Sequence, residues 1–152
     1  MTQPLLTREG IALALAEILT GIPGVTTFSR RWRKMENCAP EDQPFISLTP
    51  GREQPRNTQG LNGVVWVFEF VVTIYAYEPD PAAAPASRLN PIMDALEAAL
   101  RPAKGLPGQM QWLGDATGRI QHAWISGPVE TDEGVLGPQA IAIVPIEVEV
   151  VL

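Results

Sequence analysis

The sequence contains one cysteine and one histidine, and this scarcity excludes several kinds of chemistry. Cys38 cannot form a disulfide within the chain, so nothing points to secretion. One histidine and one cysteine cannot build a structural zinc site. No uninterrupted apolar run approaches the roughly 20 residues of a membrane span, and the first ten residues lack the features of a signal peptide. We expect a soluble protein, intracellular where it is made, with no membrane partner.

A catalytic motif is also lacking. No stretch has the strand, glycine-rich loop and helix that bind phosphate. His122 shares a predicted strand face with Trp124 and Ser126, but four residues along a strand separate His122 from Ser126 by about 13 Å. We therefore interpret His122 as a partly buried residue at a sheet or subunit interface, and Cys38 as a bystander thiol. The sequence predicts neither an enzyme nor a cofactor.

Charge is sparse and unevenly placed. Charged residues make up 18% of the chain and apolar residues 45%, which is typical of one folded domain spanning residues 1–152. Residues 1–60 hold seven Lys and Arg against six Asp and Glu, whereas residues 61–152 hold four against eleven. The net charge of −6 disfavours a nucleic-acid binder. Two differently charged regions are compatible with head-to-tail association of copies.

Two helices are predicted. Thr7 is a good N-cap for a helix over residues 7–20, with Leu6 and Ile11 spaced as a hydrophobic staple. A second apolar stripe at helical spacing predicts a helix over residues 88–101, in which Pro91 is tolerated in the first turn.

Strands are predicted at residues 25–32, 44–49 and 64–77, and two more within residues 119–152 on either side of a loop at residues 127–137. Residues 50–63 are predicted to be a long polar loop. The strand at residues 64–77 would span about 46 Å, against a radius of gyration near 15 Å for such a domain. It must bend or project as half of a hairpin, with an edge that needs a partner. Pro145 cannot donate to a ladder and predicts an edge, a bulge or a sheet break.

This order of elements predicts an α+β fold: a single mixed, mainly antiparallel sheet with two helices packed on it and a long projecting strand or hairpin.

Three groups of charged residues are candidate protein-interface sites. In order along the chain they are Arg30, Arg31, Arg33 and Lys34; Arg52 and Arg56; and Glu130, Asp132 and Glu133. The first interleaves cations with Phe28 and Trp32, a pattern that suits nucleic acid or an acidic protein surface; we favour the protein because the chain is acidic. The second lies in the predicted polar loop. The third does not match a calcium-binding EF-hand loop, so we interpret it as a solvated turn and a contact for a basic segment of a neighbouring subunit.

Residues 64–152 resemble the tail terminator, or tail completion, proteins of long-tailed bacteriophages. The resemblance lies in the long aromatic strand VVWVFEFVVTIYAY, the helix LNPIMDALEAAL, and the segments QWLGDATGRIQHAWISG and VETDEGVLGPQAIAIVPIEVEV. It extends to the first third of the chain only in the order of elements. The family has no short residue motif, so no site residue is carried over from it.

The resemblance implies a virion structural protein at the head-proximal end of the tail, assembled in the host cytoplasm. It implies a homo-hexameric ring that caps the tail tube, ends tube polymerisation and provides the surface for head–tail joining. The implied partners are other copies of the chain, the major tail tube protein, a head completion or connector protein, and DNA passing through the ring lumen. Two alternatives remain: a head–tail connector or neck protein on the capsid side, and a small ligand-binding or hydrolase domain that uses His122 and Trp124.

Overall fold

The computed structural model describes residues 7–56, 65–100, 120–134 and 137–151, without the side chains of residues 120–122, 133–134 and 151. None of the described helices is long and apolar enough to cross a membrane. Short 3₁₀ turns join the first two strands. The elements in chain order are α1 (Arg8–Thr20), β1 (Thr27–Ser29), η1 (Met35–Asn37), η2 (Pro40–Asp42), β2 (Phe45–Arg56), β3 (Val65–Tyr77), α2 (Ala86–Leu100), β4 (Ile120–Ile125), β5 (Glu130–Gly134) and β6 (Gly137–Val151).

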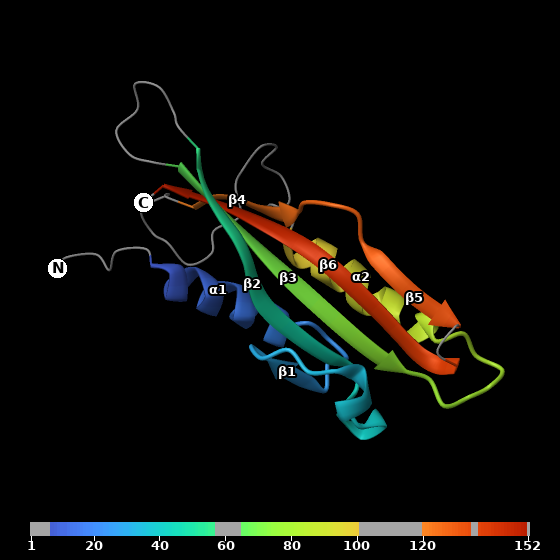
Figure 1. Ribbon diagram of the computed structural model, residues 1–152. Helices are drawn as coiled ribbons and strands as arrows, with labels where there is room; N and C mark the ends of the chain where they lie inside the picture. Colours follow the sequence, from blue (N-terminus) through green and yellow to red (C-terminus); the bar gives the residue numbers. More distant parts are fainter. Residues whose placement is uncertain (1–6, 57–64, 101–119, 135–136, 152) are drawn as a thin grey trace.

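The strands form one mixed, mainly antiparallel sheet in the order β1-β2-β3-β6-β4, with β5 also paired to β6 (Figure 1). Only the β1–β2 pair is parallel. Apolar side chains of α1, α2, β3 and β6 share one buried cluster, so both helices cover the same face of the sheet. We call this the inner face and the opposite one the outer face. The predicted α+β class is confirmed.

Helix α1 begins and ends as predicted. The Thr7 hydroxyl accepts a hydrogen bond from the Gly10 amide at 3.0 Å, and Gly21 caps the other end. Ile11, Leu15 and Leu19 are buried against the sheet, as their helical spacing requires.

Helix α2 begins two residues earlier than predicted, at Ala86. Pro91 is therefore the sixth helical residue and lies in the second turn rather than the first. The amides of Ser87 and Arg88 bond to Ala84 and Pro85 three residues back, so the helix starts with a tighter turn.

Two predicted strand boundaries are wrong. The strand expected over residues 25–32 is confined to Thr27–Ser29, and the one expected over residues 44–49 continues to Arg56. The first part of the predicted polar loop is therefore a strand, because pairing with apolar β3 outweighs the weak strand propensity of PGREQPR. The register shifts between Pro50 and Glu53, which accommodates the proline. The rest of the predicted loop, residues 57–64, lies outside the described residues.

Of the two predicted alternatives, a bend or half of a hairpin, strand β3 forms half of the β2–β3 hairpin. The expected free edge is absent, because β3 is paired on both sides. It pairs with β2 from Val65 to Tyr75 on one side and with β6 from Val65 to Tyr77 on the other. The far half of β2 is one of the edges that lack a partner strand among the described residues.

The C-terminal third contains three strands rather than two. Part of the expected loop is strand β5, which pairs with the first half of β6, while β4 pairs with its second half. Pro145 stands where β6 changes partner, and its carbonyl accepts a hydrogen bond from the Ser126 amide at 3.0 Å. The Pro145 nitrogen, which carries no hydrogen, therefore faces the gap between β4 and β5. Of the predicted alternatives of an edge, a bulge or a sheet break, the structure shows a break on one side of β6 only, because its pairing with β3 continues through Pro145.

A second, smaller cluster lies on the outer face and fixes the segment that follows β1. Cys38, Phe45 and Tyr75 are buried together, and burial raises the pKa of the Cys38 thiol. Beside them the buried amides of Gln43 and Gln139 exchange hydrogen bonds of 3.1 and 2.8 Å. This pairing holds the segment before β2 against the start of β6. A buried thiol with a raised pKa is a poor nucleophile, in line with the interpretation of Cys38 as a bystander.

Candidate protein-interaction surfaces

The strand register places β1 and β5 at the same level of the sheet, on opposite edges (Figure 1). Four strand spacings of about 4.8 Å separate these edges by about 19 Å. The segment that follows β1 and the acids of β5 therefore cannot pair within one molecule. Two rows of register partners cross the sheet here: Thr27, Phe45, Tyr75, Ile141 and Asp132, and Ser29, Ser47, Thr73, Ile143 and Glu130.

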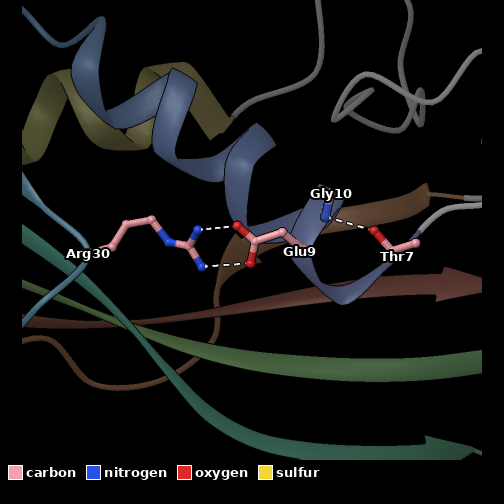
Figure 2. Close-up of polar contacts among 4 residues, drawn as sticks. All are labelled: Thr7, Glu9, Gly10 and Arg30. Atoms are coloured by element: carbon pink, nitrogen blue, oxygen red, sulfur yellow. Dashed lines mark hydrogen bonds and ion pairs between the residues drawn. The ribbon is translucent and has the colours of Figure 1, made fainter.

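The first predicted group, Arg30 to Lys34, lies beside the β1 edge. Arg30 makes a two-pronged ion pair with Glu9 in the first turn of α1, at 2.5 and 3.1 Å (Figure 2). This pair ties the end of β1 to the helix. The pair lowers the pKa of Glu9 and raises that of Arg30, chiefly through the hydrogen bonds between them.

The other cations of this group are more available to a partner. Arg31 is exposed and forms no ion pair within the described part of the chain, and its backbone is fixed by two hydrogen bonds with the Ser29 hydroxyl. Lys34 makes only a long 3.9 Å contact with Glu36. The guanidinium of Arg33 lies over the Phe45 ring at 5.3 Å. Trp32 is 54% exposed among these cations, and exposed Trp with Arg is typical of binding hot spots.

The third predicted group lies on strand β5 at the opposite edge, and this corrects the interpretation of it as a solvated turn. Glu130 and Asp132 pair with Ile143 and Ile141 of β6 and lie on the outer face. Glu133 belongs to the same strand, although its side chain is not described. Among the described residues no group of three or more potential ligands could hold a metal ion. The carboxylates are therefore an acidic edge of the sheet.

The second predicted group lies at the far end of the β2–β3 hairpin, away from the level of β1 and β5. Arg56 forms an ion pair with Glu149 of β6, whose side chain is 12% exposed. Arg52 is exposed and has no ion-pair partner among the described residues. The hairpin thus presents one uncommitted cation and one that is already used within the fold.

A cleft that the sequence did not indicate lies between α1 and the β2–β3 hairpin. Its volume is about 200 Å³, with Phe68, Phe70 and Leu48 on its apolar floor. Arg8 closes one side through a 2.7 Å ion pair with Glu53, and its guanidinium lies 5.6 Å from the centre of the Phe68 ring. The two partners stand 45 residues apart in sequence, so no local pattern could have found this contact.

His122 lies on β4. Its register partner on β6 is Glu149, and its side chain is not described. The Ser126 amide donates a hydrogen bond to the Pro145 carbonyl, and Trp124 pairs in register with Glu147.

Comparisons with known proteins give a likeness in structure. No family model and no curated protein matches the chain. Among solved structures, the chain is similar to one described as "Virion of native gene transfer agent (GTA) particle", with 11% sequence identity over 93% of this chain and 92% of that chain and a TM-score of 0.49. At this identity and TM-score the likeness carries no argument about function.

The Glu9–Arg30 pair predicts how the β1 edge responds to acid. The folded-state pKa of Glu9 is lowered, so the pair stabilises the folded protein above the ordinary carboxyl pKa. That stability is lost as the pH falls through the lowered pKa. Titration of Glu9 by NMR should give a pKa below the ordinary value of a glutamate, and Arg30→Gln should bring the Glu9 pKa back toward that value. Equal pKa values for Glu9 in both proteins would show that the pair does not form in solution.

Proposed function

We propose that the chain is a tail terminator: a virion structural protein that forms a ring on the end of the tail tube, ends tube polymerisation and receives the head. The observation that carries the proposal is the placement of opposite charges at one level on the two edges of a single sheet. Such a protomer favours head-to-tail contacts, and these close into a ring when the rotation between copies permits it. The resemblance of residues 64–152 to tail terminator proteins supplies the type of ring, a hexamer.

A terminator needs a second kind of contact, because its ring must bind the tube on one side and present a different surface on the other. The candidate for such an axial contact is the far end of the β2–β3 hairpin. It lies several residues along the strands from the β1 and β5 level, so a partner bound there leaves the two lateral edges free. The exposed Arg52 is its uncommitted cation.

The resemblance to tail terminator proteins supplies the remaining partners. In the proposed ring the tail tube protein binds one end, the head completion or connector protein binds the other, and DNA passes through the lumen. The chain acts without a catalytic residue or cofactor.

The first test is assembly on tubes. The purified chain should form rings in negative-stain micrographs and bind the ends of purified tail tubes, because closed head-to-tail contacts build a surface that matches the tube. Its loss from the producing system should give overlong tubes that carry no head. A strictly monomeric chain that ignores tubes would overturn the proposal, and tubes of normal length without the chain would favour a connector on the capsid side.

The second test separates axial from lateral contacts. Arg52→Glu should weaken docking on tubes by about tenfold while rings still form, because a reversed charge at an exposed contact removes an attraction and adds a repulsion. Arg56→Glu would not test docking alone, because it would also remove the ion-pair partner of Glu149 within the fold. The matched control is Arg31→Glu, which makes the same charge change at the β1 edge and should impair ring formation instead. Unchanged docking and unchanged rings in Arg52→Glu would exclude the hairpin end as an interface.

A further inference from the structure

The backbone of β5 presents free hydrogen-bonding groups at the edge of the sheet. The carbonyl of Pro145 points toward β4 and β5, where it accepts from the Ser126 amide. Backbone groups alternate sides along a strand, so those of Ile143 and Ile141 point the same way and bond to Glu130 and Asp132. The N–H and C=O of Thr131, between those two acids, must then point outward. In the described part of the chain, no strand lies beyond β5 to receive them.

Strand β1 forms the opposite edge of the sheet and also presents free backbone groups. The Thr27 amide donates to the Pro44 carbonyl at 3.2 Å, so the backbone groups of Thr27 face β2. By the same alternation the N–H and C=O of Phe28 point away from the sheet. No described strand lies beyond β1. Phe28 and Thr131 belong to one row across the sheet, through Ile46, Ile74 and Ala142.

We propose that β5 of one copy pairs with β1 of the next copy, with the backbone of Thr131 opposite that of Phe28, so that the sheets of neighbouring copies are continuous. The pairing rests on the proposed ring and names its lateral interface. The directions of the strands determine its geometry. Strand β1 is parallel to β2, whereas β5 is antiparallel to β2, because three antiparallel pairings (β2–β3, β3–β6 and β6–β5) connect them. Sheets placed side by side in the same orientation therefore meet as an antiparallel pair.

The same register keeps side chains on matching faces. Opposing Thr131 and Phe28 leaves both on the inner face, where Phe28 packs against the core. Glu130 then lies opposite Ser29 on the outer face, one strand spacing away. Arg31 follows Ser29 by two residues and has no ion-pair partner among the described residues. A salt bridge between Arg31 and the Glu130 of the neighbouring copy completes the contact.

Charge favours the β5–β1 pairing over the pairing of β5 with another β5 or with the exposed half of β2. Short, charged edge strands usually prevent edge-to-edge association, and β5 does repel a second β5 because each carries Glu130 and Asp132. That repulsion disfavours a two-fold dimer. The β1 edge, followed by cations, is the edge that an acidic strand attracts. The exposed half of β2 is closed to pairing by Pro50, Pro55 and a shifted register. Charge thus favours β1 as the acceptor.

Thr131→Pro tests the backbone pairing, because proline removes the outward N–H and leaves the bonds of Glu130 and Asp132 to β6 intact. Thr131→Ala is the matched control, since it keeps that N–H. We expect Thr131→Pro to raise the dissociation constant between copies by about tenfold or more relative to Thr131→Ala, in sedimentation or mass photometry. Circular dichroism and thermal unfolding identify a variant that fails to fold.

A charge swap tests the same interface without altering the backbone. Arg31→Glu and Glu130→Arg should each weaken association, and the double variant should recover most of it. If Thr131→Pro assembles as well as Thr131→Ala, or the double swap gives no recovery, the β5–β1 pairing is wrong while the proposed function stands. If the wild-type chain neither self-associates nor caps tubes, the proposed function itself fails.

Discussion

The antiparallel pairing of β3 with β6 is the interaction on which the rest of the fold depends. It is unbroken from Val65 opposite Val151 to Tyr77 opposite Gln139, and it puts the alternating apolar residues of both strands on one face. Helices α1 and α2 cover that face, and β2 and β1 add on one side. On the other side β6 is long enough to carry β4 and β5 in succession, separated at Pro145. The two lateral edges are consequences of this pair.

These edges connect the fold to the proposed role. A charge difference between two halves of a sequence has no necessary consequence, because folding can mix the charges on one surface. Here the register keeps them about 19 Å apart and at one height, where neither can neutralise the other within the molecule. Arg30 is held by Glu9 and Arg56 by Glu149, Lys34 lies 3.9 Å from Glu36, and Arg33 lies over the Phe45 ring. Among the described residues of the two basic groups, Arg31 and Arg52 are the cations with neither an ion pair nor a ring contact. One lies beside a lateral edge and the other at an end of the sheet.

The sequence predicted what depends on local periodicity and failed where long-range pairing decides. The Thr7 cap, the apolar stripe of α1, the alternation of β3 and the break at Pro145 could all be seen in short windows. The extension of β2 through PGREQPR and the strand within the acidic loop could not, because both are stabilised by partners far along the chain. The candidate residues were identified by charge alone. Their division between opposite edges required the register, and the roles of Glu9 and Arg8 required contacts with Arg30 and Glu53.

Cross-linking between copies tests the central claim, a ring closed by opposite edges, most directly. Thr27 and Asp132 lie in one row, too far apart for a disulfide within the chain, yet directly opposite in the proposed interface. Thr27→Cys and Asp132→Cys, combined in a Cys38→Ser background, should oxidise to a ladder of covalent oligomers that ends at the closed ring. A mixture of the two single variants should give only dimers. Monomers alone from the double variant, or dimers from Asp132→Cys by itself, would contradict the account.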